Sequence, residues 1–249
     1  MIVMKFDIIG DIHGCYDELI QLLQKLGYKM DGKTLKHPDG RKPAFVGDAM
    51  DRGPNSLRTM ELMFNLQDAD KLIYSPGNHC NKFYRYAKGN KVHLTHGIET
   101  TVAELDDFSL KARKNFIKRY IKFYEALPLY HTLNDGKLII AHAGIREDLI
   151  GTNQINLLRS FVLYGDVTGE RLPNGRPLRR DWARNYRGDP FIVYGHTPVE
   201  DARFINNTVN IDTGCIFGGK LTALRYPEKE IVSVPSKQLL IPDRFTSFT

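Results

Sequence analysis

The sequence lacks the features that secreted and membrane-spanning proteins need. It has only three cysteines, Cys15, Cys80 and Cys215, which are too few and too scattered for a disulfide framework. No apolar run approaches the roughly 18 residues of a transmembrane helix. Asp7 interrupts the N-terminal segment before a signal-peptide core could form. We therefore expect a cytoplasmic protein that has no membrane partner.

Internal repeats, low-complexity tracts and Gly/Ser-rich linkers are also missing. The 249 residues are 42% hydrophobic and 26% charged, which is typical of a soluble globular protein and argues against disorder. A chain of this length buries about three quarters of its extended surface, so the fold needs neither a disulfide nor a structural metal. The net charge of +6 leaves two interpretations open: a polyanionic partner, or the mild basicity of many cytosolic enzymes.

Short apolar runs alternate with helical patterns over most of the chain. Leu19, Leu22, Leu23 and Leu26 follow helical spacing and stop at Gly27, which predicts a helix that ends there. The apolar runs predicted as strands are 5–9, 43–46, 71–75, 138–141 and 191–194. The C-terminal third is rich in strand patterns, at 203–211, 221–226 and 231–234. This order predicts a single α/β (α+β) domain.

Residues 110–126 predict a long amphipathic helix, with Phe116, Tyr120 and Phe123 on its apolar face. The opposite face is entirely basic and carries Lys111, Arg113, Lys114, Lys118, Arg119 and Lys122. It is interpreted either as a surface that attracts phosphates or as an ordinary solvated helix face.

Five apolar runs end in a glycine that is accompanied by acidic, amide or imidazole side chains. In chain order these motifs are Gly10-Asp11-Ile12-His13-Gly14, Gly47-Asp48-Ala49-Met50-Asp51-Arg52-Gly53, Gly77-Asn78-His79-Cys80, His142-Ala143-Gly144 and Gly195-His196-Thr197. Ligands of α/β sheets bind beyond the carboxyl ends of the strands, so we expect the five loops to converge at one edge.

Such a convergence favours a metal centre, because crowded carboxylates without a cation raise one another's pKa. The mixture of Asp, Asn and His suits Mn, Fe, Ni or Zn better than Mg or Ca, which prefer oxygen ligands alone. A shared aspartate among six ligands predicts two ions that together act on a phosphorus centre. The six candidate ligands are Asp11, His13, Asp48, Asn78, His142 and His196.

The motif series GDIHG, GDAMDRG, GNHC, HAG and GHT resembles that of the phosphoprotein-phosphatase-like metallophosphoesterases. Among these, HGCYDELIQLL and NIDTGCIFGGKLTALRY are similar to the bacterial diadenosine tetraphosphatases. The resemblance covers nearly the whole chain. It implies a calcineurin-like metallophosphoesterase domain over 1–235 and a C-terminal tail over 236–249. The implied fold is a four-layer αββα sandwich, in which two mixed sheets are flanked by helices and a dimetal site lies at the C-terminal ends of strands.

The resemblance also implies how the ligands are shared between the ions. Asp11 and His13 bind the first ion and Asp48 bridges the two, while the second ion takes Asn78, His142 and His196. A hydroxide that bridges the ions then attacks phosphorus in line. The implied cofactors are two divalent transition-metal ions, either Mn, Ni or Co, or Fe and Zn.

Three further roles follow from the resemblance. His79 gives a proton or a hydrogen bond to the leaving oxygen. Asp51 holds that imidazole, and Arg52 clamps two phosphate oxygens. The broader family has an acid where this chain has Cys80, which is interpreted either as a redox-sensitive thiol or as a small buried filler.

Several other positions stay open at the level of sequence. Asp212 is interpreted either as a hydrogen-bond partner of His196 behind the metal or as a turn residue that caps Gly214. Arg146 and Arg180 are predicted as further phosphate-binding residues, although Arg179 and Arg184 lie close to Arg180 in sequence. The segment Gly214–Lys220 nearly matches a P-loop, but Leu221 replaces the required Ser/Thr and a strand follows, so we reject that interpretation.

The predicted function is metal-dependent hydrolysis of dinucleoside tetraphosphates, and the resemblance implies asymmetric cleavage of diadenosine tetraphosphate to ATP and AMP. The substrate is then a small nucleotide. A phosphatase for phosphoproteins (on Ser/Thr or Tyr) or for nucleic-acid ends is the alternative among enzymes. A basic nucleotide- or RNA-binding module is the alternative outside enzymes.

Overall fold

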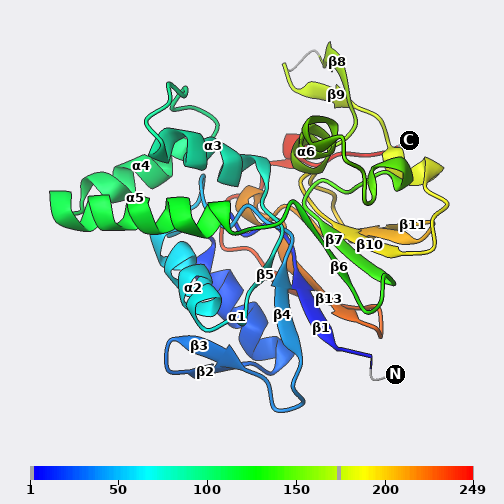
Figure 1. The fold of residues 1–249 in the computed structure, drawn as a ribbon, viewed down its shortest axis with the longest axis horizontal. Coiled ribbons are helices and arrows are strands. Elements are labelled where there is room, and N and C mark those ends of the chain that lie inside the picture. Colours follow the sequence, from blue (N-terminus) through cyan, green and yellow to red (C-terminus); the bar gives the residue numbers. More distant parts are fainter. Residues whose placement is uncertain (1–2, 173–174, 249) are drawn as a thin grey trace.

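The computed structural model describes residues 3–172 and 175–248, so the first two residues of the predicted domain and the last residue of the predicted tail lie outside it. Figure 1 shows the elements. The helices are α1 (Tyr16–Leu26), α2 (Ser56–Asp68), α3 (Asn78–Ala87), α4 (Ile98–Asp106), α5 (Leu110–Glu125) and α6 (Ile155–Tyr164). Short 3-10 helices are η1 (Glu147–Leu149), η2 (Trp182–Asn185), η3 (Cys215–Phe217) and η4 (Pro242–Arg244).

Two five-stranded mixed sheets form the centre of the molecule. The first has the order β14-β13-β1-β4-β5, with β1, β4 and β5 parallel, and the second has the order β11-β12-β10-β7-β6, with β7, β10 and β12 parallel. Their strands are β1 (Phe6–Ile9), β4 (Lys42–Phe45), β5 (Ile73–Tyr74), β6 (Tyr130–Leu133), β7 (Leu138–Ala141), β10 (Phe191–Tyr194), β11 (Arg203–Ile205), β12 (Thr208–Asn210), β13 (Lys220–Tyr226) and β14 (Glu230–Pro235). Two separate hairpins are β2 (Lys29–Asp31) with β3 (Thr34–Lys36), and β8 (Val167–Arg171) with β9 (Pro177–Arg179).

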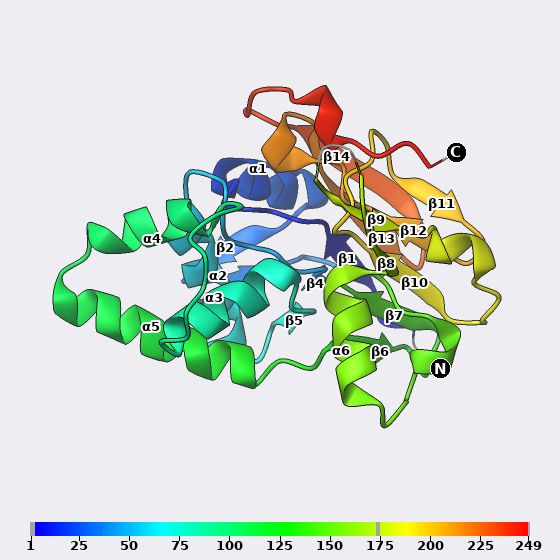
Figure 2. The same cartoon turned by 90° about the horizontal axis from the view of Figure 1, so that it is seen from above.

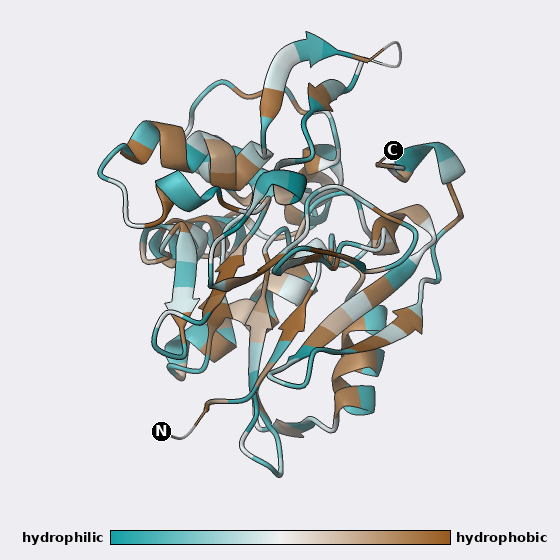
Figure 3. Cartoon of the chain, turned by 90° about the vertical axis from the view of Figure 1, so that its right-hand side faces the viewer, coloured by the Kyte–Doolittle hydropathy of each residue, from teal (hydrophilic) through white to brown (hydrophobic). Residues whose placement is uncertain are grey.

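The sheets stack face to face because their strands are apolar on both faces. Phe6 and Ile8 of β1 pack against Ile140 and Val193 of the second sheet, in a core cluster that lies between the two. The outer face of the first sheet is covered by α1 to α5 and that of the second by α6 (Figure 2). Hydrophobic residues run along the central strands (Figure 3). The predicted four-layer αββα sandwich is confirmed.

Local sequence explains the elements that were predicted. α1 ends where Gly27 takes the left-handed conformation, with φ 98°. The predicted helix over 110–126 is α5, and its apolar face is buried. On its basic face Arg119 pairs with Glu61 and Asp68, while the lysines are exposed, so the structure favours the solvated helix face.

The structure differs from the predicted strands in two places. The run predicted over 203–211 is a hairpin of β11 and β12, because the chain turns at Asn206 with φ 48°. The run predicted over 71–75 is shortened to the two residues of β5. In the part of the chain that the structure describes, no helix is long and apolar enough to cross a membrane.

The parallel strands position the functional loops. β1, β4 and β5 of the first sheet and β7 and β10 of the second all lead into one of the five motifs. Gly47, with φ 119°, allows the loops to meet closely, because a Cβ there would lie 2.5 Å from the carbonyl oxygen of Ser75.

Candidate dimetal active site

The five loops bring the predicted ligands together at the junction of the two sheets. Five of the predicted site residues have left-handed backbones, with φ between 42° and 73°; they are His13, Asp48, Asp51, Arg52 and His196. This conformation is costly for residues other than glycine, so the surrounding structure must enforce it. Five of the eleven non-glycine residues with positive φ in the described part of the chain thus lie in these loops.

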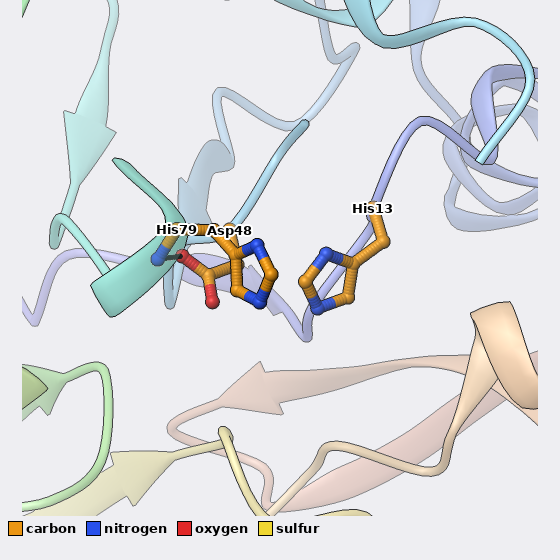
Figure 4. Close-up of side chains that lie close together, drawn as sticks. All are labelled: His13, Asp48 and His79. Carbon is orange, nitrogen blue, oxygen red and sulfur yellow. Dashed lines mark hydrogen bonds between the residues drawn. The ribbon is translucent and has the colours of Figure 1, made fainter. Parts of the chain in front are cut away.

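A first ligand cluster consists of His13, Asp48 and His79, whose potential ligand atoms all lie within 4.8 Å of one another. Figure 4 shows His13 facing the other two side chains from the loop after β1. His13 donates from Nδ1 to the carbonyl oxygen of Met50 at 3.0 Å, so its Nε2 keeps a lone pair.

A second cluster forms around His142, which donates from Nδ1 to the carbonyl oxygen of Val46 at 3.0 Å. Its Nε2 therefore carries a lone pair. That nitrogen lies 3.1 Å from Nδ1 of His196, 3.2 Å from Oδ1 of Asn78 and 3.3 Å from Oδ2 of Asp48. These atoms all have lone pairs to donate, which is the arrangement that a cation satisfies.

Asp48 belongs to both clusters. Its Oδ1 accepts the backbone N–H of His79 at 3.1 Å, at the N-terminal end of α3, while Oδ2 points to His142. Burial raises the pKa of Asp48, whereas positive charge on the surrounding imidazoles, when they are protonated, lowers it below its usual range, that of His142 most strongly. Asp48 is thus placed between the two candidate ion positions.

The other titratable groups also suit bound cations. Burial, together with the carboxylates of Asp212 and Asp48, raises the pKa of Asp11 well above its usual value. Burial lowers the pKa of His13, His142 and His196, which keeps these imidazoles neutral and able to coordinate metal. The residues therefore fit two divalent ions, which would also remove the repulsion between the carboxylates.

His79 is held by a chain of hydrogen bonds. Its Nδ1 lies 2.8 Å from Oδ2 of Asp51, and the hydroxyl of Thr101 donates to Oδ1 of the same carboxylate at 2.6 Å. The backbone N–H of Asp51 donates to Oγ of Ser56 at 3.0 Å. All four residues are buried. Thr101 and Ser56 were not predicted as site residues, and no sequence motif marks either of them.

Arg52 lies beside the first cluster. Its backbone N–H donates to the carbonyl oxygen of Gly97 at 2.9 Å, and its guanidinium carbon lies 5.2 Å from the centre of the Phe217 ring. Burial lowers the pKa of Arg52, and the nearby carboxylates raise it. A half-buried cation in this position is available to an anion at the metal site.

The two other predicted arginines have different surroundings from those expected. Arg146 forms a bidentate ion pair with Asp148 through Nε and Nη2, at 3.0 and 2.9 Å, which occupies one of the edges through which its guanidinium could bind a phosphate. Arg180 is exposed and donates to Asp166 at 3.2 Å. Its neighbour Arg179 donates from Nε to the carbonyl oxygen of Tyr164. The charge of Arg179 adds to the effect of burial in lowering the pKa of His142 and His196.

Asp212 does not hold His196 through a hydrogen bond. Its Oδ1 accepts the backbone N–H of Gly214 at 3.0 Å, which is the turn-capping role. Nε2 of His196 is buried without a hydrogen-bond partner among the described residues. Asp212 acts on the site through its charge, which raises the pKa of Asp11.

Cys80 is buried, with Sγ 3.2 Å from the hydroxyl of Tyr74 and 3.5 Å from Oδ1 of Asp48. Burial raises the pKa of the thiol, and the Asp48 carboxylate raises it further. A buried, protonated thiol is poorly reactive, so the environment favours the buried filler.

Comparison with known proteins agrees with this geometry. A family model described as calcineurin-like phosphoesterase matches residues 4–229. The chain belongs to this family. As a calcineurin-like phosphoesterase it is a hydrolase of phosphoester or phosphoanhydride bonds, and the family uses a dimetal site.

Full-length relatives are named asymmetrical bis(5'-nucleosyl)-tetraphosphatase PrpE. The relative from Geobacillus sp. (strain WCH70) is 55% identical, over 98% of this chain and 100% of its own length. The relative from Halalkalibacterium halodurans is 56% identical, over 98% of this chain and 99% of its own length.

Solved structures share the fold at low identity. A protein assigned as a diadenosine tetraphosphatase superposes with a TM-score of 0.65 at 20% identity, over 94% of this chain and 95% of that one. A serine/threonine phosphatase from Saccharomyces cerevisiae has a TM-score of 0.57 at 14% identity, over 96% and 82% of the two chains. These two similarities support the phosphoesterase fold.

Proposed function

We propose that this calcineurin-like phosphoesterase hydrolyses dinucleoside tetraphosphates asymmetrically, giving ATP and AMP from diadenosine tetraphosphate. The observation that carries the proposal is the full-length similarity, at 54–56% identity, to relatives with the asymmetrical tetraphosphatase name. The two ligand clusters that share Asp48 support it, because they supply the site that such hydrolysis requires.

The proposed ligand sets draw on both clusters. His13 and Asp48 of the first cluster would hold one ion together with Asp11, which lies outside that cluster and whose Oδ1 accepts the backbone N–H of His196 at 3.2 Å. Asp48, Asn78, His142 and His196 would hold the other ion, and His79 is assigned to the leaving oxygen instead. Two bound divalent ions supply Lewis acidity and lower the pKa of water. The nitrogen-rich ligand set favours Mn, Ni or Co, or Fe and Zn, over Mg.

The remaining residues act directly on the phosphate chain. His79 gives a proton or a hydrogen bond to the leaving oxygen, and Asp51 and Thr101 fix the orientation of its imidazole. Arg52 binds phosphate oxygens from the side of Phe217. Arg179 joins Arg146 and Arg180 as a candidate for the second phosphate-binding arginine, because it is half-buried and its charge contributes to the lowered pKa of His142 and His196.

The test compares substrates and resolves products. Purified protein is stripped with a chelator and then supplied with Mn, Ni, Co or Mg, and each form is incubated with diadenosine tetraphosphate or a phosphopeptide. The proposal expects ATP and AMP, with recovery by Mn, Ni or Co exceeding recovery by Mg. Two ADP molecules would show symmetric cleavage, and faster release of phosphate from the peptide would favour a protein phosphatase. Full activity in chelator would contradict the metal-dependent mechanism.

A further inference from the structure

The glycine-rich segment Gly214–Lys220 supports the C-terminal tail. A Cβ at Gly218 would collide with the backbone of Leu240, and a Cβ at Gly214 would lie 2.5 Å from the ring of Phe245. A Cβ at Gly219 would lie 3.0 Å from the same ring. The segment that resembles a P-loop therefore has its glycines where the tail packs, and they let the tail approach closely.

Backbone hydrogen bonds fix the tail at several points. The N–H of Lys237 donates to Glu18 at 2.9 Å, and the N–H of Ile241 donates to the carbonyl oxygen of Phe217 at 3.0 Å. Further along, the N–H of Thr246 donates to the carbonyl oxygen of Pro198 at 2.7 Å, two residues after His196. Figure 2 shows the tail in red beside the orange segment that carries η3. The tail is thus held next to the loop that carries a candidate ligand.

This docking places Arg244 over the aromatic ring that Arg52 also contacts. The guanidinium carbon of Arg244 lies 5.3 Å from the centre of the Phe217 ring, and that of Arg52 lies 5.2 Å from the same centre. The carbonyl oxygen of Arg244 accepts a hydrogen bond from Arg176 at 3.3 Å, which links the tail to the hairpin of β8 and β9. The position of Arg244 is thereby defined by its own backbone as well as by the shared ring.

The two cations share the Phe217 ring, and neither is neutralised by a carboxylate of the described residues. Among the described residues neither guanidinium forms an ion pair with a carboxylate, and Arg244 is exposed. The charge of Arg244 lowers the pKa of Arg52, so the two repel each other. Two like charges on one aromatic ring attract a ligand with several linked negative charges more than one with a single phosphate.

We propose that Arg244 is a specificity-determining residue that binds the polyphosphate chain beyond the phosphate held at Arg52, so that the site prefers dinucleoside polyphosphates to short phosphomonoesters. This inference rests on the proposed function, because that function supplies the polyphosphate chain. Arg52 acts at the reacting phosphate, whereas Arg244 acts at the neighbouring ones.

The test measures selectivity with matched substrates. Wild-type and Arg244→Gln proteins, both loaded with metal, are assayed on diadenosine tetraphosphate and on nitrophenyl phosphate, which is too short to span both arginines. The ratio of kcat/KM for the tetraphosphate to kcat/KM for the monoester should fall about 10- to 100-fold. Losing a hydrogen bond to a charged group weakens binding by about that factor. The loss should appear in KM. Phe245→Ala, which loosens the tail, should reduce the ratio in the same direction.

Two further measurements separate this proposal from the proposed function. Lys237→Gln removes another tail cation, one that pairs with Asp17, and should leave the ratio unchanged. Binding of inorganic tripolyphosphate and of orthophosphate, measured by calorimetry, tests Arg244 even if the wild-type protein does not cleave diadenosine tetraphosphate. Arg244→Gln should weaken the tripolyphosphate complex about 10-fold or more and the orthophosphate complex much less. Equal losses for both ligands, or unchanged tripolyphosphate affinity, would overturn the proposal.

Discussion

At the scale of single residues, the site depends on which atom of each side chain is already occupied. The Nδ1 atoms of His13 and His142 donate to the carbonyl oxygens of Met50 and Val46, so both imidazoles present Nε2 to the site. His79 also has its Nδ1 engaged, but by the carboxylate of Asp51 rather than by a carbonyl oxygen. The charged partner behind His79 supports its proposed role in proton transfer, whereas His13 and His142 are proposed as ligands.

Asp48 is the residue that both proposed ligand sets share. Asp48→Asn removes the shared negative charge, and we expect the variant to retain less than the full complement of metal and to lose most of its turnover. Metal content by mass spectrometry and turnover with saturating Mn provide the measurement. Asp39→Asn, which changes a carboxylate outside the clusters, is the matched control. Two bound ions and near-normal turnover in the Asp48 variant would remove Asp48 from the bridging position.

His79→Ala tests whether His79 is an acid or a ligand. As an acid, its loss should leave both ions bound and lower turnover by about 10²- to 10⁴-fold. The loss should be smaller for a nitrophenyl ester than for an alkyl ester, because nitrophenolate leaves without a proton. A nucleotide leaving group should resemble the nitrophenyl case.

The measurement uses the two esters on wild-type and variant proteins of known metal content. Equal losses on both esters would count against the acid role. Loss of an ion would instead place His79 among the ligands, beside His13 and Asp48.

The candidate ligands could be predicted because each lies in a short glycine-flanked motif at the end of an apolar run. The choice of a second phosphate-binding arginine could not be predicted, since Arg179 and Arg180 are adjacent and successive side chains near a strand end point to opposite sides. Thr101 is 50 positions away from Asp51, and its contact depends on packing that no local pattern encodes.

At the scale of elements, α4 supports the site from outside the five motifs. Thr101 donates to Asp51, and one turn later both carboxylate oxygens of Glu104 accept the first N–H groups of α2, from Ser56 at 2.7 Å and Leu57 at 3.0 Å. Since these backbone groups lack partners within their own helix, α4 caps α2 as well as holding Asp51. Both helices thereby fix the position of the loop that carries Asp51 and Arg52.

Thr101→Val should weaken the orientation of His79 without changing its chemistry. We expect turnover to fall by about 10-fold, the size of effect seen when partners behind a catalytic or metal-binding group are removed. Thr101→Ser keeps the hydroxyl and should retain most of the activity. If the effect acts through His79, the alkyl ester should again be affected more than the nitrophenyl ester, at unchanged metal content. The same loss in both Thr101 variants would indicate a packing defect.

The elements that sequence predicted poorly are those with weak local signals. α3 and α4 are short, and their stability comes from the aromatic and aliphatic cluster beneath them. The break between β11 and β12 had a visible signal, because asparagine adopts the left-handed conformation of a turn more readily than other residues. The overall order of strands and helices was predictable, since the buried strands are continuous apolar runs.

At the scale of the whole molecule, the candidate metal site joins the two sheets. Asp11, His13, Asp48 and Asn78 follow strands of the first sheet, whereas His142 and His196 follow strands of the second. Hydrogen bonds cross the same junction, from His142 to Val46 and from Ser75 to the carbonyl oxygen of Ile140 at 2.7 Å. Ions bound here would hold the layers together at the carboxyl ends of their strands.

A buried ion pair lies at the amino ends of β1 and β4, which are the ends opposite to the candidate metal site. Arg41 donates from Nε to Oδ1 of Asp7 at 2.9 Å, and its remaining nitrogens bind Glu228 and the carbonyl oxygens of Phe6 and Tyr226. The side chains of Arg41 and Asp7 are 5% and 0% exposed, so removing Arg41 leaves a buried carboxylate with the longer contact to Arg225, whose Nε lies 3.5 Å from Oδ1 of Asp7. Such a change typically costs about 3–5 kcal/mol.

Arg41→Met should therefore lower the free energy of unfolding by about 3–5 kcal/mol, while turnover per folded molecule stays near that of the wild type. The double variant Asp7→Asn/Arg41→Met removes both charges and should recover part of the loss, because the buried Asp7 carboxylate is then gone as well. Urea unfolding at a fixed metal concentration gives both values. Equal destabilisation of the single and double variants would show that Arg41 acts through its packing and its carbonyl contacts. A fall in the turnover of the folded fraction would show that the two ends of the sheet are coupled.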